Sequence, residues 1–334
     1  MVSEFGVAEY KQRQIADKYL EKAFRGKSPA QEKRLTIITG LPGSGKSTAA
    51  AKLTAENKNT VVIGSDDFYA LYPNIFNLYK KYPSSLNTKE ESAQEHSDVE
   101  NFVSESFEYA IASAMGQGYN LVIDAQPNDS LLVYAAIARD LGYKVDIKFA
   151  AVPKRQLETN IVSRHVAGVY KFEQALEGKL PQTGANIPHH FSQLRVPKDY
   201  IDSVKTLLKR IKNSDTGLEV LNVMNNQVLY PAEGKTDPAA AFENELNRPL
   251  TEKEKLRQKS ALSRIRLTIR RLRLRRNEWK TTERPAEKGY DAGTGHIAYY
   301  RHVVNNLERQ QRYKKAENLS PLFFFLPLKI IFSK

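Results

Sequence analysis

The chain has 334 residues, with 51 lysines and arginines against 38 aspartates and glutamates, a formal net charge of +13. Hydrophobic residues make up 41% of the chain and charged residues 27%, which excludes bulk disorder and indicates one or two globular domains. Because there is no cysteine, disulfide frameworks, thiolate metal sites and cysteine nucleophiles are excluded, and the composition suits a reducing cytoplasm.

Residues 1–34 form a leading region in which one helix is expected. Apolar side chains recur at helical spacing among charges across residues 7–26, which predicts an amphipathic helix. The first residues lack the basic-then-apolar order of a secretory signal, so we expect a cytoplasmic protein. No apolar run reaches the roughly 20 residues that a membrane span needs, so no transmembrane segment is expected.

Residues 35–232 alternate between apolar strands and helices. Continuously apolar strands separated by helices predict a parallel sheet with helices on both faces, an α/β fold of three layers. The expected strands are residues 35–39, 60–64, 120–124 and 145–152, followed by a late pair at 218–223 and 227–230. The expected helices between the first strands are residues 47–53, 99–115 and 130–141.

Residues 40–47 read GLPGSGKS, the pattern G-x-x-x-x-G-K-[ST] of a phosphate-binding loop between a strand and a helix. The glycines allow the backbone to wrap a phosphate, and the following helix adds its positive N-terminal end. The pattern predicts that the chain binds a nucleoside triphosphate and Mg²⁺, with Lys46 on the phosphates and Ser47 as a metal ligand. The expected nucleotide-binding residues are Gly40, Leu41, Pro42, Gly43, Ser44, Gly45, Lys46, Ser47 and Thr48.

Carboxylates follow two of the predicted strands. Asp66 and Asp67 come directly after residues 60–64, at the edge of the sheet where ligands of open α/β folds bind, and either could accept the proton of an attacking hydroxyl. The alternative is a helix N-cap. Asp124 ends the next strand and is a candidate for Mg²⁺ or substrate, the alternative again being a cap or turn. By pattern alone, Glu108 belongs to a solvated helix face.

Residues 233–280 are predicted to be a helical, basic extension, with helical structure over residues 239–276, and residues 281–334 a loop-rich tail. Residues 251–334 hold 21 lysines and arginines against 8 aspartates and glutamates, so the whole excess of +13 lies there. The run RIRLTIRRLRLRR at residues 264–276 allows three interpretations. It is a helix packed on the body with a solvated basic face, an arm for nucleic acid, or an interfacial membrane helix.

Five motifs in order resemble the zeta toxins of epsilon-zeta toxin–antitoxin systems. They are GLPGSGKS, SDDFYALYPN, QGYNLVID, AAVP followed by Arg164, and FENELNRPLT, between about Leu35 and Leu262. The resemblance implies a P-loop kinase that uses ATP and Mg²⁺ to phosphorylate the 3′-hydroxyl of a UDP-activated amino sugar, typically UDP-N-acetylglucosamine. It also implies a cognate antitoxin partner. The alternative is a P-loop kinase or ATPase that acts on nucleic acid through residues 264–276.

The resemblance also assigns roles to single residues. It makes Lys46 the P-loop lysine, Asp66 the catalytic base, and Glu108 and Asp124 substrate-binding acids. Arg164 matches the arginine that neutralises the transferring phosphate; without the resemblance it would be taken for an ion pair on a helix face.

Two departures from the family pattern concern the substrate and the phosphates. Ala125 and Gln126 stand where the family commonly has Gly-Thr, which replaces a hydroxyl contact to substrate. No clear counterpart of the family's second phosphate-contacting arginine occurs between residues 178 and 190. The cations nearest to this stretch are Lys179 and Arg195. Lysine is not an equivalent fork-shaped donor, so nucleotide binding is predicted more firmly than the identity of the sugar.

Overall fold

The computed structural model describes residues 7–81, 93–188, 196–214, 216–231 and 236–281, with the side chains of 93, 96 and 273–281 left out. These residues lie in one compact unit, Met1–Ala292. The predicted tail at residues 281–334 lies outside the described residues except for Thr281. The division of the unit into residues 1–34, 35–232 and 233–280 stays a prediction.

Six strands form one sheet in the order β2-β3-β1-β4-β5-β6. Their bounds are Arg34–Gly40 (β1), Thr60–Gly64 (β2), Asn120–Asp124 (β3), Lys144–Ala150 (β4), Gly217–Asn222 (β5) and Gln227–Tyr230 (β6). The predicted parallel sheet is confirmed for β1 to β5, and the late strand pair is confirmed as β5 and β6. β6 alone runs antiparallel, because a connection of a few residues permits a hairpin but not the crossover that parallel strands require.

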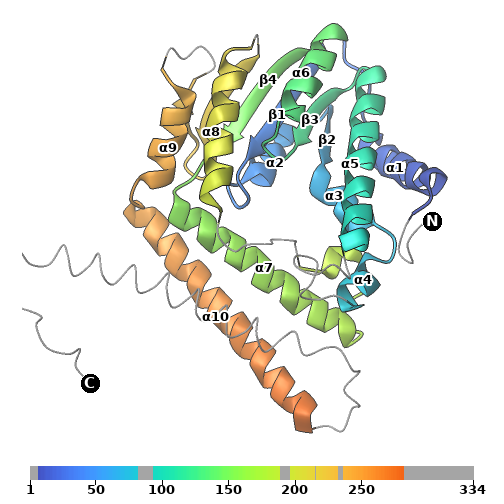
Figure 1. Cartoon of the computed structure of the whole chain (residues 1–334), viewed down its shortest axis with the longest axis vertical. Helices are drawn as coiled ribbons and strands as arrows, with labels where there is room; N and C mark the ends of the chain where they lie inside the picture. Colours follow the sequence, from blue (N-terminus) through green and yellow to red (C-terminus); the bar gives the residue numbers. More distant parts are fainter. Residues whose placement is uncertain (1–6, 82–92, 189–195, 215, 232–235, 282–334) are drawn as a thin grey trace, which may run out of the picture. The chain divides into compact units, whose positions relative to one another are not determined.

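The helices cover the sheet on both faces, which confirms the three-layer α/β class (Figure 1). α5 (Ala93–Gly116), α6 (Ser130–Asp140) and α8 (Lys198–Lys212) lie in front of the sheet in Figure 1, and α2 (Lys46–Glu56) lies behind it. On the α2 face, Ala49 and Ala50 pack against Ile38 and Val122 in one buried cluster. The central strand β1 is buried over most of its length, as its apolar run requires.

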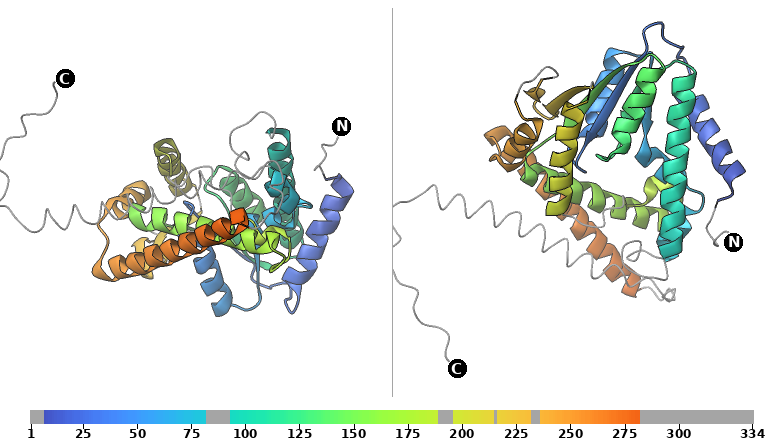
Figure 2. Two further views of the ribbon diagram at one scale, coloured as in Figure 1. Left: turned by 90° about the horizontal axis from the view of Figure 1, so that it is seen from below. Right: turned by 45° about the horizontal axis from the view of Figure 1, so that its top comes forward.

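Three shorter elements and two long helices lie around this core. α1 (Glu9–Phe24) packs against α5 beside β2, and α3 (Ser65–Leu71) and α4 (Ile75–Lys81) follow β2 directly. α7 (Lys154–Leu176) crosses near the carboxyl ends of the strands and ends before a short 3₁₀ turn, Gly184–Asn186. α10 (Glu252–Thr281) packs along α7, and the two helices stay side by side in each view of Figure 2.

Residues 239–276 are helical, as predicted, and the structure divides them between two helices, α9 (Pro238–Asn247) and α10. Pro249 has no N–H to donate and disfavours a helical conformation at the residue before it, which ends α9. Thr251 and Glu254 then start α10 as a reciprocal capping box, with Thr251 N donating to Glu254 Oε2 (2.8 Å) and Glu254 N to Thr251 Oγ1 (3.3 Å).

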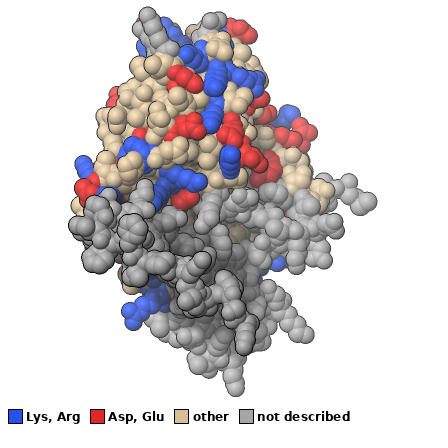
Figure 3. All heavy atoms as spheres, turned by 60° about the vertical axis from the view of Figure 1, so that its left-hand side comes forward, with Lys and Arg blue, Asp and Glu red and all other residues tan. Residues whose placement is uncertain are grey.

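The basic run at residues 264–276 belongs to α10, and the side chains described for its first part, residues 264–272, show how this helix packs on α7. Ile265, Ile269 and Leu272 are buried, and α10 contacts α7, whereas Arg264 and Arg270 are exposed. Of the three interpretations, this arrangement is the packed helix with a solvated basic face. Elsewhere, on the face turned forward in Figure 3, lysines and arginines are interspersed with aspartates and glutamates. Within the described residues, no helix has the length and apolar character needed to cross a membrane.

Candidate active site

The phosphate-binding loop joins the end of β1 to the start of α2, in the strand–loop–helix order that its sequence predicts. Gly40, Gly43 and Gly45 have φ angles of 145°, 80° and 96°, a region that favours glycine. A Cβ atom at Gly40 would lie 2.4 Å from the carbonyl oxygen of Ala150, and one at Gly43 would lie 2.9 Å from that of Leu157. The loop therefore has its shape because it is packed closely against β4 and α7 without side chains.

Lys46 lies over this loop. Its Nζ atom donates to the carbonyl oxygen of Gly40 (2.9 Å) and makes a longer contact with that of Leu41 (3.5 Å). Burial lowers the pKa of Lys46, and the carboxylates of Asp124 and Asp66 oppose that effect. The ammonium group thus stands between the loop and two acidic side chains.

Ser47 and Asp124 meet across neighbouring elements. The register places Asp124 beside Ile38 of β1 and Gly64 of β2, at the carboxyl edge of the sheet. The Ser47 hydroxyl donates to Asp124 Oδ2 at 2.9 Å. Burial raises the pKa of Asp124, while Lys46 and the Ser47 hydroxyl lower it. The Ser47 hydroxyl and the Asp124 carboxylate thus lie side by side next to the phosphate-binding loop.

Asp66 and Arg164 form an ion pair across the site. Asp66 lies in the first turn of α3, and Arg164 Nη2 reaches its Oδ2 from α7 at 2.6 Å. The side chains are 53% and 38% exposed, so both groups remain open to a ligand. The N-cap of α3 is Gly64, so neither Asp66 nor Asp67 is the capping residue that the alternative interpretation required.

The structure therefore brings together four of the predicted residues, Lys46, Asp66, Asp124 and Arg164, which act on one another electrostatically. We call them the phosphate-site cluster. Its two cations face two carboxylates beside a phosphate-binding loop, which suits the transfer of a phosphoryl group to a hydroxyl acceptor.

Glu108 lies on α5, exposed, beside Tyr134 of α6. Burial, followed by the Glu108 carboxylate, raises the pKa of Tyr134 to about 12. The predicted contact of Glu108 with substrate stays a prediction. Lys179, one of the two cations nearest to the expected second arginine, pairs with Glu177 at 2.7 Å, and Arg195 lies outside the described residues.

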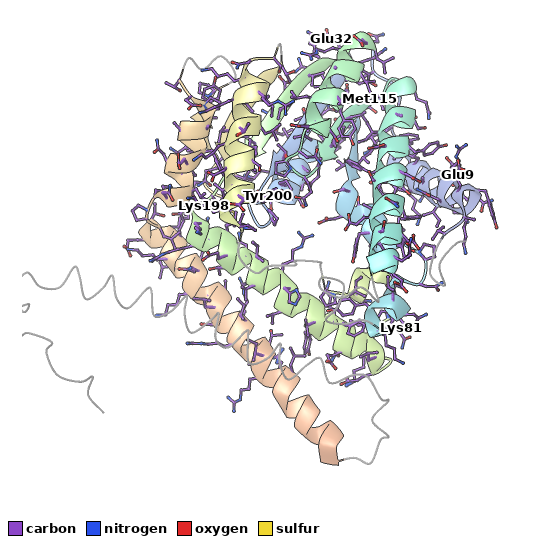
Figure 4. The ribbon with its side chains drawn as sticks, in the orientation of Figure 1. Glu9, Glu32, Lys81, Met115, Lys198 and Tyr200 are labelled. Atoms are coloured by element: carbon purple, nitrogen blue, oxygen red, sulfur yellow. The ribbon has the colours of Figure 1, made fainter. Side chains whose placement is uncertain are left out.

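Sequence reasoning missed several residues that hold the site together. Asn160 donates from Nδ2 to the carbonyl oxygen of Gly43 (2.8 Å), and Gln156 donates to Asn160 Oδ1 (2.7 Å). Gln156, Asn160 and Arg164 are four residues apart and so share one face of α7. That four-residue spacing from Arg164 was the only sign in the sequence that Gln156 and Asn160 face the site. Tyr200, labelled in the first turn of α8 in Figure 4, contacts Gln126 Oε1 at 3.4 Å.

Comparison with known proteins agrees with the motifs. The model of the zeta toxin family matches residues 16–211, from within α1 to the last turn of α8. Toxin zeta of Streptococcus pyogenes is 26% identical over 251 residues, which cover 70% of this chain and 76% of that protein. Toxin zeta of Enterococcus hirae is 25% identical over 251 residues, covering 70% of this chain and 77% of that protein.

A solved structure shares the fold. A chain from the PezAT chromosomal toxin–antitoxin system of Streptococcus pneumoniae matches with a TM-score of 0.61 at 15% identity, over 79% of this chain and 98% of that one. The solved chain shows that the fold is shared. The family model matches more than half of the 334 residues, which shows the relationship to zeta toxins. With its phosphate-binding loop and kinase-like fold, this chain belongs to the zeta toxin family.

Proposed function

We propose that this protein transfers the γ-phosphoryl group of ATP to the 3′-hydroxyl of a UDP-activated amino sugar, UDP-N-acetylglucosamine being the first candidate. The observation that carries the proposal is the 2.6 Å contact between Asp66 and Arg164 beside Lys46. A proton acceptor next to two phosphate-binding cations is what phosphoryl transfer to an alcohol needs.

Residues 40–48 are proposed to hold the phosphates of ATP. The glycine conformations and the position of Lys46 support this, as does the Ser44 hydroxyl, which is buried and has no hydrogen-bond partner among the described residues. Phosphate oxygens bound here would replace the contacts that Lys46 makes with the carbonyl oxygens of Gly40 and Leu41.

Ser47 and Asp124 are the residues that would hold Mg²⁺. The described residues contain no group of three or more histidines, cysteines, aspartates and glutamates that could bind a metal. A hydroxyl and one carboxylate nonetheless suit Mg²⁺, which usually keeps several waters and shares phosphate oxygens with the protein. When bound, the ion would neutralise charge on the β and γ phosphates.

In the proposed step, Asp66 accepts the proton of the sugar hydroxyl while that oxygen forms a bond to the γ phosphorus. The bond from this phosphorus to the bridging oxygen breaks, and ADP leaves with the electron pair. Arg164 turns from Asp66 to the transferring phosphoryl group, whose three equatorial oxygens carry the developing charge. Because the ion pair is exposed, exchanging one anion for another costs little.

The sugar is proposed to bind near Asp124 and Glu108. Gln126 stands where relatives commonly offer a hydroxyl, and its contact with Tyr200 supports a role for both side chains in shaping the sugar site. We further propose a cognate antitoxin protein as partner, because the solved chain of similar fold comes from a toxin–antitoxin system.

The test incubates the purified protein with ATP, Mg²⁺ and a panel of nucleotide sugars and follows phosphorylated products by mass spectrometry. Asp66→Ala should still bind ATP and should lose product formation, since it removes the proton acceptor. Asp202→Asn, an exposed carboxylate change on α8, is the control and should keep full activity. Product formation by Asp66→Ala at the wild-type rate would contradict the assignment of the base.

A further inference from the structure

α1 reaches the catalytic turn through Tyr19. The Tyr19 ring packs on the ring of Phe68 in α3, with 4.7 Å between centroids. Its hydroxyl lies 2.9 Å from Asp67 Oδ2 and 3.2 Å from the carbonyl oxygen of Val62. α1 is itself held firmly, since Ala16 and Leu20 are buried. Tyr19 therefore connects a fixed helix to the residue that follows Asp66.

The sequence of α3 supplies few local interactions that stabilise it as a helix. It is seven residues long, and helices this short are marginal without tertiary contacts. Its N-cap is Gly64, which has no side chain to cap the helix. Asp67 is the third helical residue, the position from which the acidic side chain of a capping box reaches back, and the backbone of Gly64 favours its ionised form. The first turn of α3 is therefore stabilised by Asp67.

The position of Asp67 also decides where Asp66 points. Successive helical side chains are about 100° apart, so a turn with Asp67 held at Tyr19 directs Asp66 to another side, where Arg164 contacts it. In the proposed reaction, Arg164 leaves Asp66 for the phosphoryl group. The bond between Tyr19 and Asp67 involves neither of these moving groups. It can hold the turn after Arg164 has left.

We propose that Tyr19 and Asp67 are positioning residues that keep Asp66 directed at the acceptor hydroxyl while Arg164 is engaged with phosphate; for catalysis, this inference rests on the proposed function. The pair couples α1 to the chemistry.

Tyr19→Phe removes one oxygen atom and keeps the ring on Phe68. We expect kcat to fall roughly 10- to 100-fold, the size of effect that a misplaced group produces, with the KM for ATP within twofold of wild type. Tyr109→Phe is the matched control, since the Tyr109 hydroxyl also bonds an aspartate, Asp17 of α1 (2.8 Å), but away from α3. It should leave kcat unchanged.

The pH dependence separates positioning from simple packing. Loss of solvation raises the pKa of Asp67, while the Tyr19 hydroxyl and the Gly64 N–H lower it. Removing the hydroxyl raises that pKa further, so the ionised form that holds the turn is lost at a higher pH. The acid limb of the kcat profile should therefore move upward in Tyr19→Phe. The titratable groups that act on Asp67 are Tyr19 from α1 and Asp66 on its own helix.

Two further measurements test whether Tyr19 and Asp67 act as a pair. Amide hydrogen exchange of residues 64–71, which needs no substrate, should be faster in Tyr19→Phe than in wild type and unchanged in Tyr109→Phe. Tyr19→Phe combined with Asp67→Ala should lose no more kcat than Asp67→Ala alone, because the two residues act as a unit. Wild-type exchange in Tyr19→Phe, or additive losses, would overturn the pairing. If wild-type protein phosphorylates no sugar, the proposed function fails while the exchange experiment still decides the pairing.

Discussion

Two clusters of charged side chains in this molecule use the same residue types in different surroundings. The phosphate-site cluster pairs Arg164 with Asp66, whose side chains are 38% and 53% exposed. A second cluster, which we call the junction cluster, pairs Arg248 (24% exposed) with Glu245 and Glu254 (3% each) where α9 meets α10. The first pair can exchange its partners for a ligand, whereas the second cannot separate without leaving buried charge.

The junction cluster has every partner supplied by the protein. Arg248 donates to Glu245 Oε2 and to Glu254 Oε1, each at 2.7 Å. Asn222 at the end of β5 donates to Glu245 Oε1 (2.6 Å), and Asn225 donates to Glu254 Oε1 (2.8 Å). Burial, and not residue type, therefore distinguishes a charged group that stabilises the fold from one that is available for chemistry.

Arg164→Ala should produce the largest effect on activity and almost none on stability. An arginine that stabilises the transferring phosphoryl group contributes roughly 10³ to 10⁵ in rate, whereas an exposed ion pair contributes about 1 kcal/mol or less to folding. Steady-state kinetics and urea unfolding of the same preparation measure both quantities. Arg164→Lys keeps the charge without the fork and should be intermediate. A loss of activity below tenfold for Arg164→Ala would remove Arg164 from the proposed mechanism.

Arg248→Ala should show the reverse behaviour. Removing one partner of a buried ion pair typically costs about 3 to 5 kcal/mol, because the remaining carboxylates stay buried and unpaired. Urea unfolding measures this loss. Arg210→Ala breaks an exposed pair with Asp129 and is the control, expected to cost about 1 kcal/mol or less. Equal costs for the two variants would show that burial does not separate the two clusters.

The junction cluster should also make stability depend on acidity. Hydrogen bonds from Arg248 first, and then from Thr251 and Asn225, lower the pKa of Glu254 from 4.5 to about 2. The stabilisation from this depressed pKa is present above pH 4.5 and is lost as the pH falls from about 4.5 toward about 2. Urea unfolding at pH 6, 4 and 3 should therefore show a steeper decline in wild type than in Glu254→Gln. Parallel declines would contradict the assigned pKa.

The exposed arginines of α10 should matter least. Arg264→Gln and Arg270→Gln together should change the free energy of unfolding by about 0.5 kcal/mol or less, as surface substitutions usually do. Sugar phosphorylation should remain at the wild-type level. If these two changes removed activity, the basic helix would be part of the substrate site, and the alternative of a kinase acting on nucleic acid would gain support.

The sequence by itself determined the elements whose information is local. The apolar runs of the strands, the glycines around Lys46 and the carboxylates after β2 and β3 lie within short segments, and the family resemblance added Arg164. The break between α9 and α10 was also readable from Pro249 and the capping pair Thr251 and Glu254. Helical periodicity on both sides of the break obscured it.

Only the tertiary structure decided which side chains meet. Arg164 contacts Asp66 across 98 positions, and Tyr19 contacts Asp67 across 48, because α7 and α1 approach the carboxyl edge of the sheet from different sides. The FENELNRPLT motif, likewise, was visible as a pattern before its Glu245 and Arg248 were known to form part of a buried network. Periodicity specifies which face of an element is apolar, whereas sheet order and helix crossing specify the partner, and those are properties of the whole fold.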